Sequence, residues 1–263
     1  MEVKKKKRLV AVLWIILFLI IWESLYRIGL YPKQSFPSLI DVINGLSKDL
    51  ASGKLLYQLL FSIEVIVKSL LIGVLLTMLL TLLWRSGIVF ESLVEMLISV
   101  AHPLPGIALL PVVILWFGVG EKSIIFIIVH SVLWPMLVNL MSGIKAVNKT
   151  HYEVGKNYGL SKMEMFFHIL LPSSFPYFIS GIRIGFSRAW RALISAEMIF
   201  GSISAFGGIG WYIFEKRIFM DTSGMYGGIL IVMIIGAFMD DVVLTNLERH
   251  MKERWGYLDE GNY

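Results

Sequence analysis

Long runs of apolar residues, separated by short polar segments, make up most of this chain. A helix needs about 20 residues to cross a hydrocarbon core about 30 Å thick. The pattern therefore predicts an all-α integral membrane protein in which residues 1–263 form a single transmembrane domain. The six transmembrane helices are expected at about residues 9–30, 55–84, 88–117, 123–145, 174–199 and 225–247.

One shorter helix is expected outside the spans. Ser38 can cap a helix whose apolar residues Leu39, Val42, Ile43 and Leu46 recur at helical spacing, with Asp41, Lys48 and Asp49 on the other side. Such an amphipathic helix is expected to lie along the outer surface of the membrane.

Basic residues beside the apolar runs predict the orientation of the chain. Lys4–Arg8 precede the first run, which places the N-terminus in the cytoplasm. The same stretch could begin a secretory signal, but no small-residue cleavage site follows, so an uncleaved span is favoured. Other basic residues predict that residues 148–172 and the C-terminus are also cytoplasmic: Lys145, Lys149, Lys156, Lys162, Arg249, Lys252 and Arg254.

Composition narrows the protein class. Hydrophobic residues make up 57% of the chain and charged residues 16%, and the mean hydropathy is +0.74, which excludes an ordinary soluble domain. The formal charge of +5 does not indicate nucleic-acid binding, because the basic residues lie in short clusters beside apolar runs. Cysteine is absent, which excludes disulfides, thiolate nucleophiles and cysteine-based metal sites.

Charged residues inside the spans require partners, because lipid does not tolerate isolated charge. In the second span, Glu64 and Lys68 lie one turn apart. They could contact an ion or substrate, but the spacing favours a self-neutralising pair. The fifth span carries Arg183, Arg188, Arg191 and Glu197. These residues could form an ion-pair network reaching Glu64 or Asp240, or they could line a substrate path.

Prolines interrupt the third span at Pro103 and Pro105, next to Gly106. A proline frees backbone carbonyls, which can be tolerated at membrane depth where protein or a water-filled cavity satisfies them. The break is either a pore wall or a packing kink. The translocation-path candidates are Pro103, Pro105, Pro111, Arg188, Arg191 and Glu197.

A polar block between the fourth and fifth spans predicts two short helices joined by a turn. Glu153 begins the first helical patch, and Gly159 can take the positive φ of a sharp turn. The second helix is amphipathic, and its apolar residues Met163, Phe166, Phe167 and Leu170 are expected to share one face for a membrane or a partner groove. Pro172 is expected to end this helix, and Pro172 and Pro176 to open the next.

This block resembles the EAA loop of permease subunits of ATP-binding-cassette importers. Glu153, Gly159, Ile169, Leu171 and Pro172 match its spacing, while Val154 and Gly155 replace the two alanines. The resemblance extends from Phe36 to Trp255 and indicates the nitrate, sulfonate, taurine and bicarbonate branch. It is carried by Phe36–Ser38, Pro103–Pro105 with Pro111, Leu115–Glu121, Gly181–Arg183, Arg188–Trp190 and Ala196–Met198.

The resemblance implies a type I importer permease fold in a bacterial cytoplasmic membrane, with both termini inside. It also implies two copies of the permease in the lipid bilayer, as a homodimer, together with cytoplasmic ATPase subunits and an extracytoplasmic solute-binding protein. The solute would be small, such as a sulfonate, nitrate or a related anion. The expected ATPase-coupling residues are Glu153, Gly155, Gly159, Met163, Phe166, Phe167, Ile169, Leu171 and Pro172.

The sequence offers no catalytic or cofactor-binding motif. Gly53-Lys54 lacks the rest of a phosphate-binding loop, and the five histidines have no metal-ligand spacing. ATP hydrolysis is therefore expected in a separate subunit, and no cofactor or metal is expected. The alternatives are a secondary carrier or channel, which would need internal repeats and a midplane ion site, and a non-transporting membrane scaffold.

Overall fold

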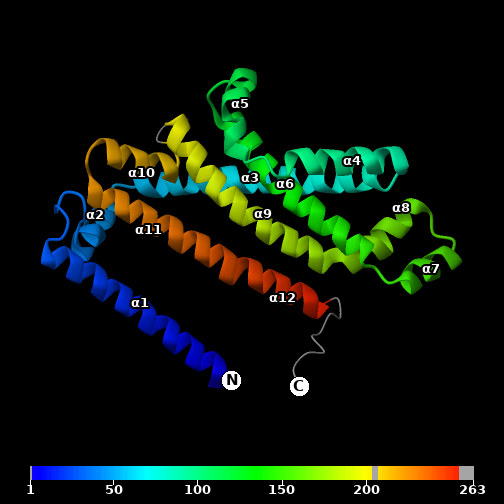
Figure 1. The fold of residues 1–263 in the computed structure, drawn as a ribbon, viewed down its shortest axis with the longest axis horizontal. Coiled ribbons are helices and arrows are strands. Elements are labelled where there is room, and N and C mark those ends of the chain that lie inside the picture. Colours follow the sequence, from blue (N-terminus) through cyan, green and yellow to red (C-terminus); the bar gives the residue numbers. More distant parts are fainter. Residues whose placement is uncertain (1, 203–206, 255–263) are drawn as a thin grey trace.

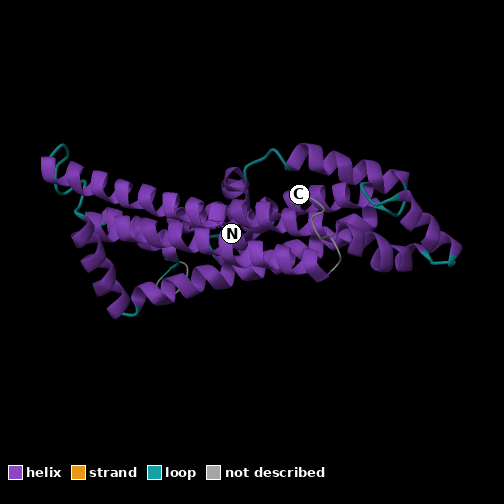
Figure 2. Ribbon diagram, turned by 90° about the horizontal axis from the view of Figure 1, so that it is seen from below, coloured by secondary structure: helices purple, strands orange, loops and turns teal. Residues whose placement is uncertain are grey.

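The computed structural model describes residues 2–202 and 207–254, and within these ranges every regular element is a helix (Figures 1 and 2). Residues 203–206 and Trp255 lie outside the described residues. The α-helices are α1 (Glu2–Ile28), α2 (Leu39–Ala51), α3 (Lys54–Trp84), α4 (Ile88–Ala101), α5 (Leu110–Phe117), α6 (Glu121–Lys145), α7 (Lys149–Asn157), α8 (Lys162–Met165), α9 (Leu171–Phe200), α10 (Ile209–Ile218), α11 (Thr222–Phe238) and α12 (Thr245–Arg254). A 3₁₀ turn, η1 (Gly106–Leu109), precedes α5, and π turns occur at η2 (Phe166–Leu170) and η3 (Met239–Leu244).

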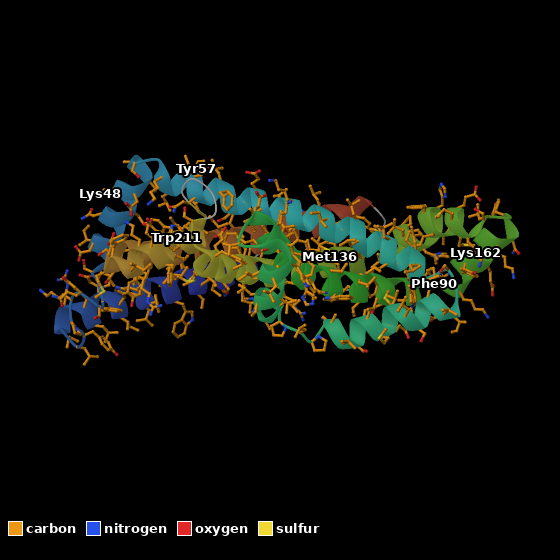
Figure 3. The ribbon with its side chains drawn as sticks, turned by 90° about the horizontal axis from the view of Figure 1, so that it is seen from above. Lys48, Tyr57, Phe90, Met136, Lys162 and Trp211 are labelled. Atoms are coloured by element: carbon orange, nitrogen blue, oxygen red, sulfur yellow. The ribbon has the colours of Figure 1, made fainter. Side chains whose placement is uncertain are left out.

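The helices form an elongated bundle with two distinct ends. Helices α2 and α10 lie at one end, and α7 and α8 lie at the other (Figure 1). Lys48 and Lys162 mark these opposite ends in Figure 3. Five helical segments are long and apolar enough to cross a membrane, and α4 with η1–α5 forms a bent pair that could be a sixth. The expected all-α membrane fold is confirmed.

Helix α6 forms the centre of the bundle. Its apolar residues are buried between α3 and α9, and 67% of its most apolar window is covered by protein. Small residues permit the close approach: a Cβ on Gly73 of α3 would lie 2.9 Å from Val132 Cγ1, and one on Gly181 of α9 would lie 3.0 Å from the Met136 Cα. Such small-residue contacts are typical of helix packing in membranes.

The third apolar segment is sharply bent. Helix α4 and the η1–α5 segment meet at 90° across the Pro103–Pro105 break. Helix α4 alone has 14 residues, which is about 21 Å of helix and shorter than a hydrocarbon core. The interruption that the prolines predicted is therefore a corner in the chain, and it brings the break against α6 and α9.

The prediction that Pro172 ends the second short helix is wrong. A continuous helical segment runs from Lys162 to Phe200, with Pro172 in the first turn of α9. The π turn η2 lies directly before it. A π turn changes the hydrogen-bonding register at the point where proline cannot donate. This arrangement lets the helix pass Pro172 without stopping.

The described glycines at the start of α10 are close contact points. A Cβ on Gly208 or Gly210 would collide with the Glu197 side chain. The following residues form the helix α10, whose Ile209 and Tyr212 are almost fully buried.

Helix α1 lies apart from the rest of the bundle (Figure 1), and none of its most apolar window is buried by protein. Its C-terminal end is fixed by Trp22, which stacks on Phe36 at 4.7 Å and donates from Nε1 to the Pro37 carbonyl at 3.1 Å.

Candidate functional site

A cavity of about 620 Å³ lies where the break between α4 and η1 meets α6 and α9. The break supplies a wall that includes Pro103 and Pro105, and Gly106 allows this wall to approach α6 closely. A Cβ at Gly106 would collide with Ser131 Oγ and lie 2.8 Å from the Ile127 carbonyl oxygen. The cavity also has a polar lining, which includes His102, His130, Ser131, Trp134, Arg188 and Arg191.

The structure brings together four of the six path candidates. Pro103, Pro105, Arg188 and Arg191 line the cavity. Pro111 and Glu197 are not among the residues that line it, so the place of these two residues in the path stays a prediction. Pro111 lies instead in the first turn of α5, where its missing N–H is tolerated.

The arginines of α9 divide into two kinds. Arg183 is paired, with its Nε 2.8 Å from Asp240 Oδ1 and its Nη1 3.7 Å from Glu248 Oε2. In the part of the chain that the structure describes, neither Arg188 nor Arg191 has an acidic partner within salt-bridge distance. The predicted network therefore exists for Arg183 and Asp240, but it does not extend to the two arginines of the cavity.

The Glu64–Lys68 spacing is confirmed as an ion pair. Lys68 Nζ lies 2.7 Å from Glu64 and 2.8 Å from Glu121 at the start of α6. Both partners of the i, i+4 pair are substantially exposed, at 44% and 59% of their side-chain areas. This cluster is distinct from the cavity.

Glu197 is buried, with 1% exposure, and it joins three helices. It accepts hydrogen bonds from Ser62 Oγ of α3 at 2.6 Å and from the Gly210 N–H of α10 at 2.8 Å. Ser62 in turn accepts from the Ile209 N–H at 2.9 Å. Glu197 therefore holds the start of α10 against α3 and α9.

The polar block forms the expected pair of short helices at the end of the bundle opposite α2 and α10 (Figure 1). The first of them begins at Lys149 and not at Glu153, because Asn148 supplies the cap. Asn148 caps α7, and Ser161 forms a capping box with Glu164 at α8. Between them Gly159 has φ +75°, which confirms the predicted sharp turn. The chain therefore reverses over very few residues.

Gly155 fixes the contact between the two short helices. It is buried in α7, and a Cβ there would collide with Ile169 Cδ1 and lie 2.9 Å from Met165 Sδ. The glycine that replaces an alanine of the resembled loop is thus needed for close packing. Glu153, on the same helix, is exposed, with its Oε1 3.8 Å from Lys149 Nζ.

The apolar residues of the second short helix do not share one free face, contrary to the prediction. Met163 and Phe167 are 55% and 49% exposed, whereas Phe166 and Leu170 are 2% and 4% exposed. The two i, i+4 pairs separate because one side of the segment packs into the main hydrophobic core. Ile169, Leu171 and Pro172 are half-buried.

Sequence reasoning missed two groups of residues. Tyr158 is 82% exposed beside Gly159, and only its place at a surface helix end could have indicated a contact role. His102, His130 and Trp134 line the cavity. The i, i+4 spacing of His130 and Trp134 could have placed these two on one helix face, but no sequence signal joins them to His102. Among the described residues, no group of three or more His, Asp or Glu side chains could hold a metal.

A second polar cluster lies at the α2–α10 end. Lys216 Nζ lies 2.6 Å from Asp49 and 2.7 Å from Asp221, and Tyr212 donates to Asp49 at 2.6 Å. Burial opposes the charge on Asp221, but the Lys216 ammonium and the Gly224 N–H outweigh it and lower the pKa of Asp221. Burial likewise opposes the charge on Lys216, but the two carboxylates raise its pKa.

Comparison with known proteins gives consistent matches. The family described as "Binding-protein-dependent transport system inner membrane component" matches residues 69–253. The aliphatic sulfonates transport permease protein SsuC of Escherichia coli is 33% identical over 165 residues, covering 63% of this chain and 60% of that protein. The taurine transport system permease protein TauC of Escherichia coli is 29% identical, covering 61% and 57%. These alignments span less than two thirds of either relative.

The fold also matches a solved structure. The crystal structure of an amino acid ABC transporter with histidines superposes with a TM-score of 0.61 and 15% sequence identity. The match covers 80% of this chain and 97% of the solved one. At this level of identity the likeness concerns the fold.

Proposed function

Because the chain belongs to the family of binding-protein-dependent transport system inner membrane components, we propose that it is the membrane-spanning permease subunit of an ATP-driven importer for a small solute. ATP hydrolysis in this family resides in a separate subunit. Two copies of the chain would form the path, two ATPase subunits would bind on the cytoplasmic side, and a solute-binding protein would deliver the solute from outside.

The observation that carries the proposal is the continuous helical segment from Lys162 to Phe200. Its first residues form the short-helix element that resembles the EAA loop, and Arg188 and Arg191 farther along line the cavity. A displacement of the short helices would be transmitted along this segment to the cavity wall. The proposed ATPase-docking element and the cavity wall therefore belong to one helical segment, with no loop between them.

The proposed mechanism is alternating access. Closure of the ATPase dimer on ATP would move α7 and α8 through their exposed apolar side chains, Met163, Phe167 and Tyr158. Helix α9 would then shift against the Pro103–Pro105 break and switch the cavity between outward and inward openings. Binding of ATP favours one of two states because the docked ATPase contacts differ between them.

The substrate class proposed is a small anion, such as a sulfonate, nitrate or a related oxyanion. The matched relatives are named for aliphatic sulfonates and taurine. The two cavity arginines, which lack acidic partners within the described residues, support an anionic solute.

Replacing Gly159 tests the docking element. A β-branched residue at φ +75° is strained by about 1 to 2 kcal/mol, although a Cβ there would meet no atom within 4 Å. Gly159→Val should therefore lower copurification of the ATPase or substrate-stimulated ATP hydrolysis while membrane insertion survives. Gly87→Val is the matched control, because Gly87 is extended and its Cβ would also meet open space. Normal coupling in Gly159→Val would refute the docking assignment.

Single cysteines test the proposed orientation, in which both termini are cytoplasmic in a bacterial inner membrane. Ser47, Ser202, Ser86 and Ser161 are exposed, and the chain has no native cysteine. Cysteines at the first two positions should react with an impermeant thiol reagent from outside, and cysteines at the last two should not. The opposite pattern would contradict the orientation.

A further inference from the structure

The lining of the cavity between the proline break, α6 and α9 includes buried polar atoms without hydrogen-bond partners. Three buried nitrogen atoms in the described residues have no hydrogen-bond partner and lie in its lining: His102 Nε2, His130 Nδ1 and Trp134 Nε1. Buried polar groups in folded proteins are nearly always hydrogen-bonded. Three such groups around one space therefore indicate a polar occupant.

The charge of the lining selects the kind of occupant. Arg188 and Arg191 both border the cavity, and none of the described lining residues is acidic. Arg191 Nε donates to the Ser187 carbonyl of its own helix at 3.0 Å, which leaves the other guanidinium donors of Arg191 available. Asp240 borders a neighbouring hollow beside both arginines, but it is held by Arg183 at 2.8 Å.

The hydrogen-bond donors in the cavity lining fit an oxyanion. Trp134 can only donate through its indole N–H, and the arginine forks match groups with several acceptor oxygens. His130 stands beside Trp134 with a ring-centroid distance of 5.9 Å, so both present their nitrogens from the same part of α6. The proline wall and Ala192 add apolar surface, and about 620 Å³ lies within the range of small-molecule sites.

We infer that this cavity is a binding site for an organic oxyanion with a short apolar tail, of the alkanesulfonate class. The inference rests on the proposed import function and places part of the solute selectivity in the permease itself. Arg188, Arg191 and Trp134 bind the sulfonate oxygens, and the proline wall contacts the tail. Because no described lining residue is acidic, a zwitterion with an ammonium in place of the terminal methyl lacks a partner for its cation.

A near-isosteric pair of probes tests this selectivity. Binding of 1-propanesulfonate, taurine and n-propylammonium is measured by calorimetry on the purified permease–ATPase complex. We expect saturable binding of 1-propanesulfonate, at least tenfold weaker binding of taurine, and no binding of n-propylammonium. Equal binding of taurine and 1-propanesulfonate, or absence of 1-propanesulfonate binding to an assembled complex, would overturn the inference.

Two tryptophan variants test the geometry. Trp134→Phe removes the N–H donor and keeps an aromatic ring, so 1-propanesulfonate should bind about tenfold more weakly, as expected for a lost hydrogen bond to a charged group. Trp84→Phe is the control, because Trp84 is also buried with an unpartnered indole nitrogen but does not line the cavity. The affinity of the Trp84→Phe variant for 1-propanesulfonate should equal that of the wild type. Equal affinities of wild type and Trp134→Phe would overturn the assignment.

The proposed function has a separate readout. Copurification of the ATPase and stimulation of its hydrolysis report on the permease role, whatever the cavity binds. An assembled, coupled complex that fails to bind 1-propanesulfonate would defeat the cavity inference alone. A chain that associates with no ATPase would defeat the proposed function.

Discussion

Replacing Glu197 by alanine should destabilise the end of the bundle that carries α2 and α10. The change leaves the Ser62 hydroxyl and the Gly210 N–H without their buried acceptor. Each lost partner costs about 1 to 3 kcal/mol, and relief from burying a polar carboxyl offsets part of the sum. The expected net loss is about 2 to 4 kcal/mol, or a decrease in melting temperature of about 5 to 15 °C on the scale of soluble proteins.

Thermal unfolding of the detergent-purified protein measures this loss, and limited proteolysis should show earlier cleavage near α10. Glu64→Ala provides the control, because Glu64 also lies on a spanning helix but is 59% exposed, and Lys68 keeps its bond to Glu121. An exposed pair of this kind contributes about 0 to 1 kcal/mol. An unchanged melting temperature in Glu197→Ala would refute the role assigned to its three-helix contact.

Two further outcomes are expected. Gly155→Val should separate α7 from Ile169 and so reduce copurification of the ATPase. Val154→Ala is the control, because Val154 is an exposed neighbour and its replacement should have a smaller effect. Equal yields of copurified ATPase in the two variants would contradict the close packing at Gly155. The pKa of Asp221 is lowered in the folded protein, so its ion pair with Lys216 stabilises the α2–α10 end. This stabilisation is fully present above about pH 4, the ordinary pKa of aspartate. It is lost as the pH falls through the lowered pKa of the folded protein. Melting curves between pH 7 and pH 3 should show this loss, and Asp221→Asn should flatten it; an equally steep acid dependence in the variant would exclude Asp221 as its source.

Local rules predicted the features that depend on neighbours in the sequence. The Glu64–Lys68 pair follows from one helical turn, and the turn at Gly159 follows from the freedom of glycine at positive φ. The Ser38 cap of α2 is also as predicted. Each of these features involves groups only a few residues apart, so the sequence contains the whole interaction.

Features that depend on distant contacts could not be predicted in the same way. Glu197 looked like a path residue, but its partner Ser62 lies 135 positions earlier in the chain. His102 follows α4 and His130 lies in α6, and both line one cavity because the chain turns by 90° after α4. Pro172 was expected to stop a helix because the π turn before it has no reliable sequence signal.

The separation of α1 from the bundle has a consequence for how the chain is made. Apart from the contacts of its C-terminal end, this helix gains little from the folded core, since none of its most apolar window is buried by protein. Its insertion is therefore driven by transfer into lipid and needs no later segment to be synthesised first. Exchanges among aliphatic residues on α1 should be tolerated during evolution far more freely than exchanges on α6, where 67% of the most apolar window is buried by protein. Trp22 is the exception, because it fixes the early-inserted helix to the chain that follows.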